Sequence, residues 1–96
     1  MSFDTSAWTS GQVWYALNDG ADVQVASGTT TVTVSAGDVI HLKISGTNAQ
    51  TPIVGFTAAS NGAGVVSPVQ NSGTNYTCDV SGIYATTGTA PVIEIK

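Results

Sequence analysis

The chain has 96 residues and a formal net charge of −4, and its cationic side chains are two lysines, besides one histidine. Proteins that bind nucleic acid neutralise phosphates with several lysines or arginines, so this composition excludes a nucleic-acid partner. The same count excludes a membrane surface held through a basic patch. One domain is expected at this length, and the single cysteine, Cys78, excludes an intramolecular disulfide.

Residues 1–11 differ in character from the rest of the chain, because they are small and polar except for Phe3 and Trp8. We expect them to form a polar arm that lies outside the sheets, followed by one β-sandwich domain over residues 12–96. The first six residues contain neither a basic region nor an apolar run, and no apolar stretch reaches about 18 residues. The expectation is therefore a soluble protein made in the cytoplasm without a signal peptide.

From residue 13 onward, short β-type segments alternate with turns. Val13–Leu17 is followed by Asn18–Gly20, whose residues tolerate the positive φ of a hairpin turn. Residues 23–25 alternate, and Thr29–Val34 is so rich in β-branched residues that a helix is disfavoured. The clearest strand is predicted over Val39–Ser45, where apolar residues at every second position share one face, and His41 and Lys43 lie on the other.

The second half of the chain continues in the same way. Ile53–Thr57 predicts another strand, and Val65–Gln70 is assigned to a sheet edge because Pro68 has no N–H to donate. Residues 75–80 alternate between apolar and polar, and Pro91–Lys96 predicts the last strand. About eight short antiparallel strands at this spacing predict an all-β fold, a single β-sandwich or jelly-roll-like domain.

The residues that could support catalysis have structural explanations. His41 is predicted on the solvent face of a strand, and the alternation around Cys78 points its thiol into the core, where cysteine acts as a small apolar residue. Most carboxylates lie in turns, where they bond the local backbone. Asn18–Asp22 offers oxygen ligands but lacks the spacing of a calcium loop. We therefore predict no enzyme activity, no cofactor and no metal.

Aromatic residues remain as candidates for recognition. Trp14 lies on the face opposite its neighbours Val13 and Tyr15, so one of the two sets points away from the core unless both faces are covered. Burial of the tryptophans in a thin core is one interpretation. The other is that aromatic rings pack against a partner or stack on a sugar ring. In that interpretation the partner-binding residues are Phe3, Trp8, Trp14 and Tyr84.

Two functions fit this composition and fold. The first is a non-enzymatic structural protein, a virion component such as the capsid decoration (cement) protein of a tailed bacteriophage. Such a protein docks on a protein lattice through its edge strands or its arm, and it can also associate with itself. The alternative is a small carbohydrate-binding module or lectin that uses exposed aromatic residues. A lectin is expected to bind a glycan as an isolated protein, whereas a cement protein binds an assembled shell.

Overall fold

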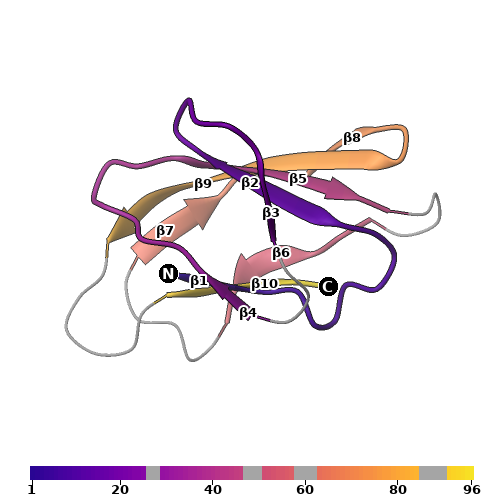
Figure 1. The fold of residues 1–96 in the computed structure, drawn as a ribbon, viewed down its shortest axis with the longest axis horizontal. Helices are drawn as coiled ribbons and strands as arrows, with labels where there is room; N and C mark the ends of the chain where they lie inside the picture. Colours follow the sequence, from indigo (N-terminus) through magenta and orange to yellow (C-terminus); the bar gives the residue numbers. More distant parts are fainter. Residues whose placement is uncertain (26–28, 47–50, 58–62, 85–90) are drawn as a thin grey trace.

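The fold is a sandwich of two β-sheets that face each other across one core (Figure 1). The computed structural model describes residues 1–25, 29–46, 51–57, 63–84 and 91–96. Within these residues every regular element is a β-strand, which confirms the all-β prediction. None of the described segments forms a helix long and apolar enough to cross a membrane.

The larger sheet has six strands, and all its pairings are antiparallel. Along the sheet the order is β3 (Val23–Val25), β2 (Val13–Leu17), β5 (Ile40–Ser45), β9 (Asn75–Tyr84) and β7 (Ala63–Val66). The sixth strand, β8 (Gln70–Ser72), also pairs with β9.

The edge segment predicted over Val65–Gln70 divides between two strands. β7 ends at Val66 and β8 begins at Gln70, and Pro68 lies in the stretch between them. Proline cannot donate a hydrogen bond to a neighbouring strand, so the pairing with β9 is interrupted there. The prediction that this part of the chain lies at a sheet edge is confirmed.

The smaller sheet has four strands in the order β4 (Thr29–Thr31), β1 (Ser2–Asp4), β10 (Val92–Ile95) and β6 (Val54–Phe56). β1 runs antiparallel to β4 but parallel to β10, and β10 runs antiparallel to β6. The parallel pair departs from the predicted wholly antiparallel arrangement. It joins β1 and β10, which lie at opposite ends of the sequence. A short hairpin turn makes two strands antiparallel, and no such turn connects these two.

The first eleven residues belong to the sandwich, so the prediction of an arm outside the sheets is wrong. Residues 2–4 form β1, which has a paired strand on each side. Phe3 is fully buried and Trp8 is only 6% exposed. A strand of three residues with one apolar side chain is too short to show periodicity, and its partners lie far along the sequence. The sequence therefore carries no local signal for it.

The core lies between the inner faces of the two sheets. In β5 the apolar residues point inward while His41 and Lys43 are exposed, as predicted. The cross-strand partners of these apolar residues on β9 are also buried. The six inward residues of this central pair of strands are Ile40, Leu42, Ile44, Tyr76, Cys78 and Val80.

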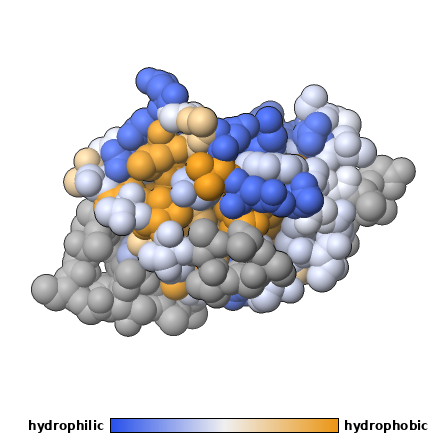
Figure 2. Space-filling view, viewed as in Figure 1, coloured by the Kyte–Doolittle hydropathy of each residue, from blue (hydrophilic) through white to orange (hydrophobic). Residues whose placement is uncertain are grey.

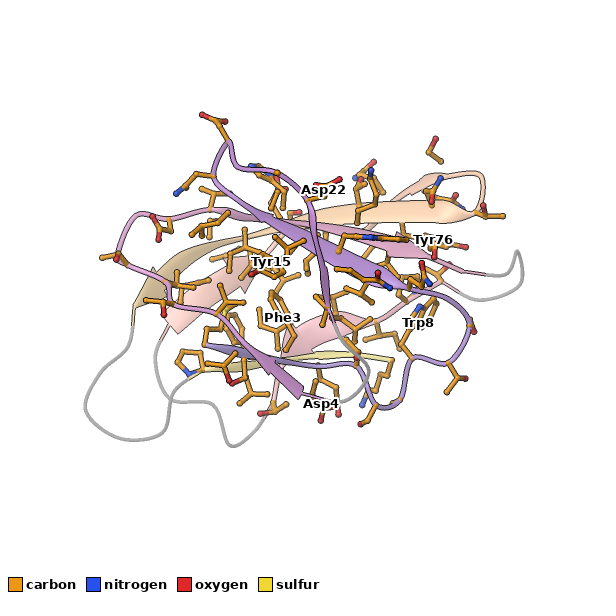
Figure 3. The ribbon with its side chains drawn as sticks, viewed as in Figure 1. Phe3, Asp4, Trp8, Tyr15, Asp22 and Tyr76 are labelled. Atoms are coloured by element: carbon orange, nitrogen blue, oxygen red, sulfur yellow. The ribbon has the colours of Figure 1, made fainter. Side chains whose placement is uncertain are left out.

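Phe3 connects the two layers of the sandwich. Its ring centroid lies 5.5 Å from that of Tyr15 on β2, with an angle of 31° between the ring planes. Figure 3 shows both rings in the space between the sheets. Aromatic pairs at such a separation contribute about 0.5–1.5 kcal/mol beyond the apolar area that they bury.

Replacing Phe3 by alanine is expected to lower the free energy of unfolding by about 3–5 kcal/mol, because a fully buried ring leaves a cavity. Phe3→Leu, which keeps more of the volume, is expected to cost less. Urea unfolding followed by tryptophan fluorescence measures both. Thr9→Ala, at an exposed residue of the same segment, is the matched control.

Deleting residues 1–10 is expected to unfold the domain, since it removes β1 from between β4 and β10. A truncated chain that kept its cooperative unfolding transition would contradict this placement of β1.

Candidate functional site

Two of the four predicted partner-binding residues lie in the core, Phe3 and Trp8 (Figure 3). The indole Nε1 of Trp8 donates a hydrogen bond of 3.1 Å to the backbone oxygen of Ser45. The ring also lies against Gly46, where an added Cβ would come within 2.9 Å of Cζ2. Both the polar and the apolar parts of Trp8 are thus used inside the domain. Neither residue is the exposed anchor that the sequence suggested.

Trp14 lies on the outer face of the larger sheet and is half-buried. The neighbouring Val13 points into the core, and Tyr15 contacts Phe3 there. Of the two sets of side chains on β2, Trp14 is therefore the one that points away from the core. Tyr84 ends β9, where its backbone pairs with Ala63. The side chain of Tyr84 lies outside the described part of the structure.

A row of outward side chains with Trp14 near one end crosses the larger sheet. Trp14 lies opposite Gln24 on β3 and opposite Lys43 on β5. Lys43 lies opposite Thr77 on β9, which in turn lies opposite Gln70 on β8. The outer row therefore consists of one indole, two carboxamides, one hydroxyl and one ammonium group.

A hydrogen bond and an ion pair lie beside this row. The Nδ1 atom of His41 is 2.7 Å from the Oδ1 atom of Asp79, and Lys43 Nζ is 3.3 Å from Asp22 Oδ2. β5 and β3 flank β2 on opposite sides, so the contact between Lys43 and Asp22 crosses the outer surface of β2. Ala16, which points outward from β2, is only 7% exposed. Both contacts are half-exposed, and each contributes at most about 1 kcal/mol.

A cavity of about 240 Å³ lies where the segment of residues 5–12 meets the ends of β2 and β3. Trp8 forms one wall, and Val13 and Val25 contribute the buried apolar part of its lining. Gln12 and Gln24 also border the cavity, and both are exposed. All the described residues that line the cavity are uncharged.

Sequence reasoning missed Gln12 and Gln24. A signal for both was present, because Gln12 precedes Trp14 by two residues and therefore shares its face in a strand. The turn after Leu17 then folds Gln24 back opposite Trp14. The cavity itself could not be anticipated, since it depends on the path of residues 5–12.

The Asn18–Asp22 segment begins with a turn, as predicted. Asn18 has a φ of 53°, and its side chain accepts a hydrogen bond from Val39 N and donates one to Asp38. The pKa of Asp38 is lowered by the backbone N–H of Ser35 and by this bond from Asn18. Within the described ranges, no three His, Cys, Asp or Glu residues gather where they could hold a metal ion.

His41, Cys78 and Ser67 are described residues that carry nucleophilic or basic groups. Burial, and then the charge of Asp79, raise the pKa of Cys78 to about 11, so its thiol is protonated at neutral pH. The hydroxyl of Ser67 accepts a hydrogen bond from the backbone N–H of Asp79, while His41 contacts the carboxylate of the same residue. Acyl transfer needs a nucleophile within reach of a base. The contacts of His41, Cys78 and Ser67 do not supply that pair.

One side of the sandwich exposes apolar residues between the two layers. β3 and β4 are the edge strands of their sheets, and both lie on the side that faces the viewer in Figure 1. Figure 2 shows hydrophobic residues at the centre of this side, with hydrophilic residues above them. Val23 on the edge strand β3 is 47% exposed and lies opposite Tyr15 on β2. Tyr15 and Leu17, two residues apart on β2, are half-buried and pack against the core. We call these three residues the open side.

The open side follows from the lengths of the edge strands. Within the residues that the structure describes, β3 pairs only with Val13 to Tyr15 of β2 and does not extend as far as Leu17. In the same part of the chain, β4 pairs only with the three residues of β1. The chain then crosses to the larger sheet, where Asn18 N donates to Val39 O. Short edge strands thus leave the apolar residues next to them partly uncovered.

Comparison with known proteins identified no relative: no family model, no curated protein and no solved structure matches the chain. The functional interpretation therefore depends on three features of the described residues. These are the outer row, the cavity and the open side.

Native Cys78 is expected to react with a thiol reagent at pH 8 at least a hundredfold more slowly than the unfolded chain, in which a free thiol has a pKa of about 8.5. Ellman's reagent, added with and without urea, measures the two rates. Equal rates would show that the thiol is accessible and readily ionised in the native protein.

The raised pKa of Cys78 also predicts a pH dependence of stability. The native thiol keeps its proton up to about pH 11, whereas the unfolded thiol loses it near about pH 8.5. The contribution of the protonated thiol is therefore present below about pH 8.5 and is lost as the pH rises toward 11. The free energy of unfolding in urea is measured for the wild type and for Cys78→Ala, at neutral pH and at about pH 10.5. Because the variant lacks the thiol, comparison of the two proteins isolates the contribution of the thiol. The difference in stability between the two proteins is expected to shrink at the higher pH.

Proposed function

We propose that the chain is a non-enzymatic structural protein that docks on copies of itself or on other subunits of a protein lattice. Capsid decoration (cement) proteins on the virions of tailed bacteriophages are the kind of component that we have in mind. The observation that carries the proposal is the open side, where Val23 is 47% exposed beside Tyr15 and Leu17.

Burial of the open side would supply the free energy for docking. Covering an exposed valine or leucine side chain contributes about 1.5–3 kcal/mol when burial is complete. Tyr15 adds an aromatic ring with a polar end, the kind of residue that is enriched where proteins meet. Because the edge strands β3 and β4 are only three residues long, side chains rather than long runs of backbone would carry the contact.

The distribution of charge supports a neutral contact. Both lysines are engaged within the chain, Lys43 with Asp22 and Lys96 with Glu94. Depletion of charge at the centre of an interface is typical of protein–protein contacts. The net charge of −4 and the paired lysines argue against an anionic polymer as the partner.

The sequence left two routes to a lattice, the edge strands and the first residues of the chain. Phe3 and Trp8 are buried in the sandwich, so the proposal uses the edge strands and the open side as the docking surface. Phe3 and Trp8 then act on assembly only by holding the domain together.

Val23→Lys is expected to abolish self-association, because it places a charge in the middle of the open side. The exposed position makes the change tolerable for folding. Light scattering across a concentration series measures the mass, and the variant should fall to the 9.7 kDa of a single chain. Val65→Lys is the matched control, since Val65 is 64% exposed on β7 at the opposite edge of the same sheet.

Two results would count against self-association through this surface. One is a wild-type protein that stays at the mass of a single chain at every concentration. The other is an equal loss of association in Val23→Lys and Val65→Lys, which would indicate a general effect of added charge.

A further inference from the structure

The strand β3 forms one edge of the larger sheet, where β2 is its partner among the described strands. The other side of an edge strand presents backbone N–H and C=O groups that a strand of another molecule can bond. We propose that a second copy of the chain supplies this strand, so that two β3 strands pair antiparallel about a twofold axis at Gln24. This inference rests on the self-association proposed above, and it names the strand and the register through which the copies meet.

The sequence of β3 is complementary to itself. It is Val23-Gln24-Val25, which reads the same in both directions. About a twofold axis, a contact of residue i with residue j is always accompanied by a contact of j with i. When the axis lies at Gln24, Val23 of each copy lies opposite Val25 of the other, and the two glutamines lie opposite each other. Every cross-strand pair therefore joins side chains of the same type.

The valine pairs would cover apolar surface on the inner face of the sheet. Val23 and Val25 share this face, because they lie opposite Tyr15 and Val13 on β2. Val25 is buried, whereas Val23 is 47% exposed. A valine of the second copy placed opposite Val23 would continue the core-facing side of the sheet beyond its present edge. The apolar area removed from water there favours the contact.

The glutamine pair would lie on the outer face, where Gln24 is exposed. A carboxamide carries both donors and an acceptor, so two glutamines at the axis can bond each other reciprocally. The residues of β3 are uncharged, and the preceding Asp22 contacts Lys43 of its own chain at 3.3 Å. Residues 22–25 therefore bring no unpaired charge to the contact between two acidic chains.

The other edges of the larger sheet fit such a pairing less well. β7 has a register shift between Ala63 and Val65, and a shift of this kind turns an edge away from a partner strand. β8 follows Pro68, and all three of its side chains are exposed and polar. A strand added beside β8 would cover no apolar side chain of that strand. The edge at β3 is thus the one at which pairing also buries a valine.

The short contact sets its expected strength. Two strands of three residues each bury less than the about 1,200–2,000 Å² of stable interfaces. The pairing therefore sets the register, while the side chains of the open side supply most of the free energy. The isolated dimer is expected to have a dissociation constant of about 0.1–1 mM. A lattice that holds many copies close together would raise the occupancy of the contact.

Disulfide cross-linking of the full chain tests the register. In an antiparallel pair, Cα atoms directly opposite each other lie about 4.5 or 5.5 Å apart, within the range of about 4.4–6.8 Å that a disulfide spans. Gln24→Cys meets this condition. In Val23→Cys the two introduced residues would be offset by two positions along the strand, which places their Cα atoms roughly 8 Å apart and too far for a bridge.

The rate of linkage is measured by non-reducing gel electrophoresis after a mild oxidant is added. Gln24→Cys is expected to form the linked dimer at least tenfold faster than Val23→Cys. Gln70→Cys is the matched control and is expected to be equally slow, because Gln70 is an exposed glutamine on the edge strand β8. The native Cys78 is buried, so the introduced thiol is the accessible one in each variant.

Charge variants test the axis without an oxidant. Gln24→Glu alone and Gln24→Lys alone each place like charges opposite each other, whereas an equimolar mixture of the two places opposite charges together. Light scattering is expected to show that the mixture associates about tenfold more tightly than either variant by itself. The same two substitutions at Gln70 are expected to give no such difference.

Two results would overturn the pairing and leave the proposed self-association intact. One is linkage of Gln24→Cys no faster than that of Gln70→Cys, in a protein whose mass still rises with concentration. The other is a mixture of the two charge variants that associates no better than either alone. A wild-type protein that keeps the mass of a single chain at every concentration would overturn both the pairing and the self-association.

Discussion

The smaller sheet depends on the insertion of β1 between β4 and β10. Among the described strands, β4 pairs with β1 alone, so without these three residues it would have no partner in that sheet. The side chain at the centre of the strand, Phe3, also reaches Tyr15 across the core. Hydrogen bonds within one layer and ring packing between the layers therefore originate from the same short segment. Because β1 pairs with a strand on each side and Phe3 contacts the other sheet, the stability of the domain depends on residues 2–4.

The two tryptophans illustrate how the path of the chain assigns different roles to similar residues. Trp8 lies in a segment that approaches β5 closely, and a Cβ at Gly11 would overlap the backbone of Ser45 there. Trp8 is buried in this segment, and both Trp8 and Gly11 line the cavity. Trp14 lies in a regular strand, where the alternation of faces places it outside among Gln24 and Lys43. Trp8 therefore lines the cavity, whereas Trp14 lies on the outer face of the larger sheet.

The sequence was informative where alternation was long and partners were near. The alternation of apolar and polar residues in β5 predicted which side chains face the core and which face outward. Pro68 predicted that its segment lies at the edge of a sheet. β1 could not be found, because one apolar residue in three sets no period and its partners in β10 lie at the other end of the chain. The sequence around Phe3 and Trp8 likewise left both interpretations open, burial in the core and contact with a partner, and the structure shows that both residues are buried. The polar residues Gln12 and Gln24 acquire a shared location only once the turn after β2 is known.

The parallel pairing of β1 with β10 has a mechanical consequence. Two parallel neighbours place the start of one strand and the end of the other at opposite ends of the sheet, as Figure 1 shows for the two termini. Tension applied between Met1 and Lys96 would then act along both strands and load their hydrogen bonds together in shear. Pulling on an antiparallel hairpin from its open end would instead break them one after another. Resistance to force is a kinetic property governed by the unfolding barrier, and this geometry raises that barrier for force transmitted along the chain.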